Sequence, residues 1–215
     1  RFEQNFEKVY DAPLLQNIPF YAVAGNHDHK GNVSAQIEYS KRSKRWTFPD
    51  YYHSIDFAVP ATNRTVQIVL IDTVIGLDDP SEYPNGDLLD PHVMSKAQAQ
   101  WEWLDGQLSA STADYLWVGG HYPVWSSCIH GPTSSLVKLL KPRLEAVGAH
   151  YMNGHDHCMG HYVENGESVN YVLTGSGYEC CYHPWLSFLI PHNATKFLAA
   201  GTDGQAHQKL PVKLE

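Results

Sequence analysis

The stretch that decides the fold runs from Tyr115 to Pro123 and reads YLWVGGHYP. It opens with four apolar or aromatic residues, as a buried strand does, and its two glycines end the strand and allow a sharp turn into a polar loop. The same arrangement recurs in HYMNGHDH, from His150 to His157, and in PFYAVAGNHDH, from Pro19 to His29. Three apolar runs are therefore each followed by glycine and then histidine.

Apolar residues elsewhere keep helical or strand spacing. Helices are predicted over 2–10, 94–108 and 136–147, and strands over 19–24, 51–57, 66–71, 115–118 and 150–152. Residues 160–164 and 168–174 are predicted to form a hairpin whose two-residue turn is Asn165-Gly166. This order predicts an α/β or mixed sheet flanked by helices, in one domain.

The three histidine-bearing loops are expected to meet. The carboxyl ends of strands in an open α/β sheet line the ligand crevice, which would bring GNHD, GHYP and GHDH to one edge of the sheet. Imidazole together with amide or carboxylate oxygen suits Fe, Mn or Zn. The sequence therefore predicts a metal site there, and the alternative is a set of turn-forming polar loops without a metal.

The composition argues against some classes of binding partner. The chain has 215 residues, 15 basic against 23 acidic, with a net charge of −8 and 13 histidines. The acidic balance argues against a nucleic-acid partner bound through phosphates. No apolar segment is long enough to span a membrane. The histidine excess favours a metal or acid–base site, unless the extra histidines are ordinary surface residues.

Cysteines and glycosylation sequons bear on the compartment. No pair of cysteines has C-x-x-C spacing, which argues against a zinc ribbon or a thioredoxin-type site. Sequons occur at Asn32, Asn63 and Asn193. Their number favours a secretory protein, with chance matching as the alternative. The chain begins at Arg1 and carries no signal peptide, so we expect a secreted or lysosomal location only from the sequons and from the resemblance that follows.

The ordered motifs GNHD, GHYP and GHDH resemble the last three motifs of the binuclear metallophosphoesterases. Their flanks resemble the animal-type purple acid phosphatases, also called tartrate-resistant acid phosphatases. The likeness is strongest in AGNHDHKGNVSAQIEYSKRSKRW (24–46), LIDTV (70–74), GHYPVW (120–125) with HGPT (130–133), and YVLTGSG (171–177). It implies a domain over 1–177 with an αββα sandwich of mixed sheets, incomplete at its N-terminus. Residues 178–215 contain no motif of the family, and their fold is left open.

The resemblance also implies roles for six positions. Asn26, His121 and His155 would bind a divalent metal and His157 a ferric ion, in an Fe–Fe centre or one of Fe with Zn or Mn. His27 and His130 would act as catalytic groups, and both would contact the substrate phosphate together with Asn26. For His130 the alternative is a merely exposed loop residue. The other eight histidines, His29 among them, are given no role.

The implied function is a metal-dependent acid phosphatase that hydrolyses phosphate monoesters, of small molecules or of phosphoproteins. A metal-activated hydroxide would attack phosphorus, and a protonated histidine would help the alkoxide to leave. One alternative is a related metallophosphoesterase acting on nucleotides or diesters. Another is an impaired, truncated paralogue that binds at most one metal.

The sequence departs from the family in ways that favour the second alternative. The motifs G-D-x-G and G-D-N-x-Y, which supply Asp and Tyr ligands, do not occur in these 215 residues, so one metal position is expected to be incomplete. The resemblance also implies a disulfide, but the two positions at which the family has cysteines carry other residues in this sequence. Cys128 and Cys158 could pair instead or remain free thiols. The polar stretch from Gly76 to Pro91 is expected to be a surface loop or an autoinhibitory lid.

Overall fold

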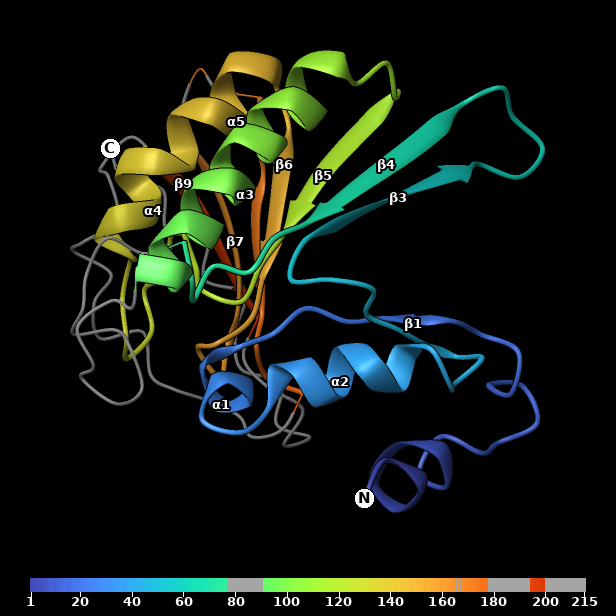
Figure 1. Ribbon diagram of the computed structural model, residues 1–215. Helices are drawn as coiled ribbons and strands as arrows, with labels where there is room; N and C mark the ends of the chain where they lie inside the picture. Colours follow the sequence, from blue (N-terminus) through green and yellow to red (C-terminus); the bar gives the residue numbers. More distant parts are fainter. Residues whose placement is uncertain (77–90, 165, 167, 178–193, 200–215) are drawn as a thin grey trace.

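A computed structural model of the chain describes residues 1–76, 91–164, 166, 168–177 and 194–199. These residues form a seven-stranded mixed sheet, a second sheet of two strands, and helices on the outside (Figure 1). The predicted mixed sheet with flanking helices is therefore confirmed.

The large sheet has a parallel centre and antiparallel edges. In spatial order its strands are β3 (His53–Ala58), β4 (Thr65–Leu70), β5 (Tyr115–Gly119), β6 (His150–Asn153), β8 (Tyr171–Thr174), β7 (Met159–Glu164) and β9 (Ala194–Ala199). Strands β4, β5, β6 and β8 run parallel, whereas β3, β7 and β9 are each antiparallel to their neighbours. The carboxyl ends of β4 and β5 point toward α1 (Asn26–His29) in Figure 1.

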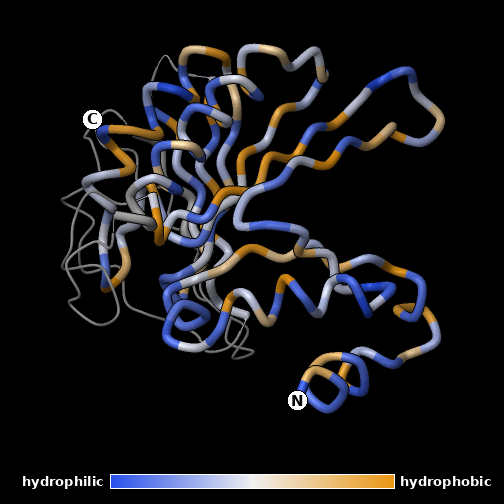
Figure 2. The backbone as a smooth tube through the Cα atoms, in the orientation of Figure 1, coloured by the Kyte–Doolittle hydropathy of each residue, from blue (hydrophilic) through white to orange (hydrophobic). Residues whose placement is uncertain are grey.

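Three helices cover one face of this sheet: α3 (Pro91–Ala110), α4 (Ser134–Leu139) and α5 (Lys141–Val147) (Figure 1). Their inward leucines recur every four residues, so they lie on one stripe of each helix. The main core is formed by these leucines and the strand residues beneath them, among them Leu104, Leu108, Leu136, Leu140, Leu144, Val69, Val118 and Tyr151. Figure 2 shows apolar stretches along the strands and hydrophilic residues in α1.

The single helix predicted over 136–147 is wrong in one respect, because the structure divides it into α4 and α5. Pro142 lies at the start of α5 and has no N–H with which to continue a preceding helix. Gly148 ends α5 with φ +70°, a left-handed conformation that glycine adopts without strain.

The amino-terminal segments form less regular structure than the sequence predicts. The helix expected over 2–10 is a short π-helix, η1 (Glu3–Glu7). The strand expected over 19–24 shortens to β1 (Phe20–Tyr21), which pairs in parallel with β2 (Trp46–Thr47) in the small sheet. The guanidinium of Arg45 ties η1 to the segment before β2, because it donates to the Glu7 carboxylate at 2.6 Å and to the Glu7 carbonyl at 3.1 Å.

The hairpin of β7 and β8 is confirmed, but its predicted two-residue turn is wrong. The strands pair from Met159↔Thr174 to Tyr162↔Tyr171, so the connection spans 165–170. Strand β9, from the 178–215 segment, pairs with β7. Among the helices that the structure describes, none has the length and apolar character needed to cross a bilayer. Residues 77–90 of the expected loop or lid lie outside the described residues.

Candidate metal centre

The first histidine loop follows β1, and α1 within it is held by Asp28. The Gly25 N–H donates to Asp28 Oδ2 at 2.9 Å, and Gln36 Nε2, from α2 (Val33–Ser40), donates to Asp28 Oδ1 at 2.7 Å. The His27 N–H donates to Asn26 Oδ1 at 3.0 Å, which orients that amide. Since β1 belongs to the small sheet, the expectation that all three loops leave one sheet is wrong.

A contact that the sequence did not reveal fastens α1 to the large sheet. His29 Nε2 lies 2.7 Å from Oδ2 of Asp72, a carboxylate with no exposed surface at the end of β4. Asp72 Oδ1 also accepts from the backbone N–H groups of Val74 and Ile75. The two residues are 43 positions apart, and no spacing rule links them. His29 therefore supports the site, although no role was predicted for it.

The second loop places His121 beside the first. Both the His121 and the Tyr122 N–H donate to Thr73 Oγ1, at 3.0 and 2.9 Å, which fixes the turn after β5. A side chain at Gly25 would bring its Cβ within 2.6 Å of His121 Nδ1. Glycine is needed at position 25 because the imidazole occupies the space of a side chain.

Three polar atoms converge at this point. His121 Nε2 lies 2.9 Å from Asn26 Oδ1 and 3.2 Å from His155 Nδ1. A ring nitrogen of a neutral imidazole carries either one proton or one lone pair, so His121 Nε2 cannot make a separate hydrogen bond to each neighbour. A cation between the three atoms would satisfy all of them.

The spacing of the donor atoms fits a first-row metal. Two ligand atoms about 2.1 Å from the same ion lie about 3.0–3.4 Å apart at octahedral or tetrahedral angles. The distances of 2.9 and 3.2 Å match this within a small adjustment. The N and O donors also suit iron, zinc or manganese, so these residues fit a metal.

The third loop holds His155 in an unusual conformation. Its φ of +69° is a left-handed value that a residue with a side chain adopts at a cost, often at functional sites. The following residue, Asp156, is fully buried, and a Cβ at Gly175 would lie only 1.8 Å from the Asp156 carbonyl oxygen. The close approach of β8 to this loop therefore supports the strained backbone.

The remaining predicted residues lie around these donors. The His130 ring is 4.4 Å from the His155 ring, centroid to centroid, although His130 itself is exposed. His27 is exposed on α1, and His157 is half-buried. The structure thus brings all six predicted positions to one region. Their roles as ligands and catalytic groups stay predictions.

Burial keeps two of the candidate ligands uncharged. Desolvation lowers the pKa of His121 to about 4, partly opposed by the negative charge of Asp28. It lowers the pKa of His155 to about 3, and the neighbouring His121, His130, His157 and His27 lower it further. Both imidazoles therefore keep a lone pair at a mildly acid pH, where an exposed histidine would be protonated.

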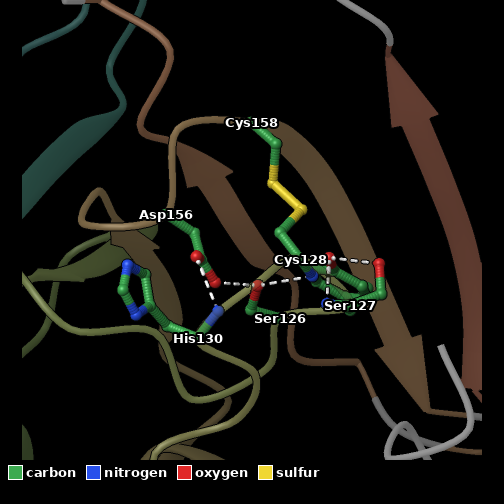
Figure 3. The surroundings of a disulfide bond; sticks show 7 residues. Ser126, Ser127, Cys128, His130, Asp156 and Cys158 are labelled. Atoms are coloured by element: carbon green, nitrogen blue, oxygen red, sulfur yellow. Dashed lines mark hydrogen bonds between the residues drawn. A yellow bond between two sulfur atoms is a disulfide. The ribbon is translucent and has the colours of Figure 1, made fainter. Parts of the chain in front are cut away.

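The cysteine alternatives are settled by the structure. Cys128 and Cys158 form a disulfide between the loop that carries His130 and the loop that carries His155 (Figure 3). Cys180 and Cys181 lie outside the described residues.

The sequons have different surroundings. Asn32 and Asn63 are exposed, whereas Asn193 lies outside the described residues. Asn32 Oδ1 also accepts from the Ala35 N–H at 2.8 Å and so caps α2. A helix cap is thus a second reason for asparagine at position 32.

The second metal position is not built by the described residues. Within them, no three His, Cys, Asp or Glu side chains are grouped so as to hold a metal ion. The donor set above reaches three because Asn26 contributes an amide oxygen. The carboxylates of Asp28, Asp72 and Asp156, which lie near the site, all accept hydrogen bonds from backbone N–H groups.

Comparisons of the sequence find relatives among the acid phosphatases. The chain is similar to tartrate-resistant acid phosphatase type 5 of Mus musculus, with 47% identity over 178 residues, 82% of this chain and 54% of the relative. The same enzyme of Homo sapiens is 45% identical over 82% of this chain and 54% of the relative. Purple acid phosphatase 4 of Arabidopsis thaliana is 32% identical over 86% and 55%. The chain spans about half the length of the curated relatives it matches.

A solved structure, described as GAP50, the anchor in the inner membrane complex of Plasmodium, shares the fold with a TM-score of 0.71 and 22% identity. The match covers 99% of this chain and 72% of that one. The family model for the calcineurin-like phosphoesterases matches residues 1–159. The three loops supply one set of donor atoms, and the family model covers most of the chain. The chain therefore belongs to the calcineurin-like phosphoesterase family.

Proposed function

We propose that the protein containing this chain is a metal-dependent acid phosphatase acting on phosphate monoesters. The observation that carries the proposal is the convergence of Asn26 Oδ1, His121 Nε2 and His155 Nδ1 from three separate loops. The similarity to acid phosphatases of animals and plants supports the reaction class. Small-molecule monoesters and phosphoproteins are the substrates that we expect.

Asn26, His121 and His155 would hold one divalent metal, and His157 would contribute to a second position. A metal bound there supplies a Lewis acid for the phosphate oxygens and a hydroxide nucleophile at modest pH. The depressed pKa of His121 and of His155 suits an enzyme that works in acid, because the two nitrogens do not have to lose protons before they bind. We propose iron, or iron with zinc or manganese, as the metals.

His27 and His130 are the groups we assign to the substrate. His27 is exposed beside Asn26 on α1, and the ring of His130 faces that of His155. Protonated imidazole at either position would attract a phosphate dianion and could pass a proton to the departing alkoxide oxygen. Asn26 is the third residue expected to contact the phosphate.

A one-metal, catalytically impaired chain is the second candidate. It is favoured by the donor atoms, since Asn26 Oδ1, His121 Nε2 and His155 Nδ1 supply one set of three, and no three His, Cys, Asp or Glu side chains are grouped as a metal site within the part of the chain that the structure describes. On this alternative the protein is an impaired or inactive truncated paralogue of the acid phosphatases that binds at most one metal.

We propose a secreted or lysosomal location. The Cys128–Cys158 disulfide supports it, because disulfides persist in oxidising compartments. The exposed sequons at Asn32 and Asn63 agree. Treatment of the natural protein with a peptide N-glycosidase should reduce its mass if these sites carry glycans, and an unchanged mass would contradict glycosylation.

Activity is tested with p-nitrophenyl phosphate and bis-p-nitrophenyl phosphate at pH 5. The complete gene product is expected to hydrolyse the monoester much faster than the diester. Faster hydrolysis of the diester would favour the related phosphodiesterases, and failure to hydrolyse either would refute the proposal. The 215-residue chain assayed in parallel tests the one-metal alternative.

Metal binding is tested separately by calorimetric titration of the 215-residue chain with Zn²⁺ at pH 7. We expect one equivalent to bind, and binding should be lost in His121→Ala and in His155→Ala. His157→Ala is the matched control, because it removes an imidazole from the same loop without touching the three convergent atoms. Two equivalents in the unsubstituted chain, or equal loss in all three variants, would contradict the assignment.

A further inference from the structure

Two loops that carry site histidines are tied to each other beneath the candidate centre. One runs from Ser126 to His130, after β5, and the other from Gly154 to Cys158, after β6. Figure 3 shows the bonds between them, which are one disulfide and a set of hydrogen bonds around a single carboxylate.

The disulfide lies close to the site histidines in the sequence. Cys128 precedes His130 by two residues, and Cys158 directly follows His157. Both cysteines are buried, at 1% and 4% exposure, so the bridge is shielded from solvent.

The carboxylate of Asp156 makes the second connection. This residue lies between His155 and His157 and has no exposed surface. Its Oδ1 accepts from the His130 N–H at 3.1 Å, and its Oδ2 accepts from the Ser126 hydroxyl. Ser126 Oγ in turn accepts from the Cys128 N–H at 3.0 Å. The network therefore links the backbone of His130 to the residue that lies between His155 and His157.

The consequence is a fixed relation between two imidazoles. The rings of His130 and His155 lie 4.4 Å apart with a tilt of 36°. His155 keeps a left-handed φ, which persists only when its surroundings impose it. The loop is also held from the far side, where the Gly175 N–H donates to the Cys158 carbonyl at 3.1 Å. Without the bridge, the His130 loop would lose its only covalent tie to the His155 loop in the described residues.

We propose that Cys128 and Cys158 are positioning residues: their disulfide, with Asp156, holds His130 and His155 in the arrangement needed to bind metal and phosphate. The effect on metal and phosphate binding rests on the proposed function. The connection of the two loops through the disulfide and Asp156, called the clamp below, does not. It predicts a local loosening of residues 126–131 and 154–158 when the bridge is removed, together with weaker metal binding.

The test compares the 215-residue chain with Cys128→Ala/Cys158→Ala by amide hydrogen exchange and by Zn²⁺ titration. Removing the bridge should accelerate exchange in both loops by at least about tenfold through local opening, whereas exchange in β5 should accelerate only as far as the loss of global stability requires. Supporting groups of metal ligands typically contribute 10–100-fold to affinity, so we expect Zn²⁺ to bind about 10–100-fold more weakly.

Two control variants separate positioning from general stability. Ile129→Ala shortens an exposed side chain of the same loop without touching the bridge and should leave exchange and Zn²⁺ affinity unchanged. Val169→Ala removes two buried methyl groups from the main core. It should lower the melting temperature without selective loosening of the two loops and without weaker Zn²⁺ binding.

Hydrogen exchange tests whether the clamp holds the two loops, and Zn²⁺ titration tests whether the clamp supports the metal site. Unchanged exchange in both loops overturns the clamp. Unchanged Zn²⁺ affinity, in a parent chain that binds Zn²⁺, overturns its role at the site. A parent chain that binds no Zn²⁺ contradicts the proposed metal centre, and the exchange result still decides whether the disulfide holds the loops. A loss of Zn²⁺ affinity as large in Val169→Ala would also overturn the positioning role.

Discussion

His29 Nε2 lies 2.7 Å from Oδ2 of Asp72, and this contact joins the helix that carries Asn26 and His27 to the end of β4. The carboxylate of Asp72 is fully buried, and its other oxygen accepts two backbone N–H groups. The position of the first loop relative to the sheet therefore depends on one buried carboxylate.

Replacing this carboxylate should be severe. Asp72→Ala removes the partner of His29 and leaves two buried N–H groups unsatisfied. Breaking a buried pair in this way costs about 3–5 kcal/mol. Urea denaturation should show a loss of that order in the free energy of unfolding. Asp56→Ala, an exposed carboxylate on β3, is the control and should change it by less than about 0.5 kcal/mol. A similar small change in Asp72→Ala would show that the contact does not hold the loop.

Gly175→Ala should disrupt the third loop. Its Cβ would lie 1.8 Å from the Asp156 carbonyl oxygen, so the backbone of one segment must move. Overpacking of this kind typically costs about 1–3 kcal/mol or more. Gly177→Ala is the matched control, because a Cβ there meets nothing within 4 Å. Thermal unfolding should show a lower melting temperature for the first variant only. Equal melting temperatures would mean that the two segments do not approach this closely in solution.

The sequence predicts features that depend on neighbouring residues better than features that depend on contacts between distant residues. Strands β5 and β6 follow from apolar runs that end at glycine, and the histidine loops follow from them. The break between α4 and α5 was missed because the leucine stripe continues across Pro142. The short β1 was missed because its extent depends on β2, a strand of two residues about 26 positions further along the chain.

The site was predicted only where its motifs are contiguous in sequence. The pair of His29 and Asp72 and the bond from His130 to Asp156 join different loops, so no motif contains them. The Cys128–Cys158 pairing could not be chosen over free thiols, because a disulfide requires proximity that only the fold creates.

The disulfide should also contribute to global stability. It closes a loop between residues 30 positions apart, and the chain-entropy model gives a stabilisation of about 3–4 kcal/mol for a loop of that size. Cys128→Ala/Cys158→Ala should lose this amount in chemical denaturation. Ile129→Ala, an exposed residue beside Cys128, should not lose it. No loss in the first variant would show that the bridge does not form in solution.

Acidification should destabilise the metal-free chain. Burial holds the pKa of His121 at about 4 and that of His155 at about 3, below the value of about 6.5 that each has when unfolded. Between pH 6.5 and pH 3 the unfolded chain therefore binds more protons than the folded one. The stabilisation is complete above pH 6.5 and is lost as the pH falls through this window.

One such imidazole contributes a slope of at most about 1.4 kcal/mol per pH unit. Urea denaturation in the presence of a chelator, at intervals from pH 7.5 to pH 4, should show the free energy of unfolding falling below pH 6.5. His121→Gln/His155→Gln should fall less steeply, because the amide does not titrate. Saturating Zn²⁺ should raise the free energy of unfolding of the parent chain alone, by a nearly constant amount down to about pH 4, since both imidazoles are already unprotonated in the folded state and the metal binds only that state. Parallel curves for the parent and the double variant would show that these two histidines are not buried as the structure places them.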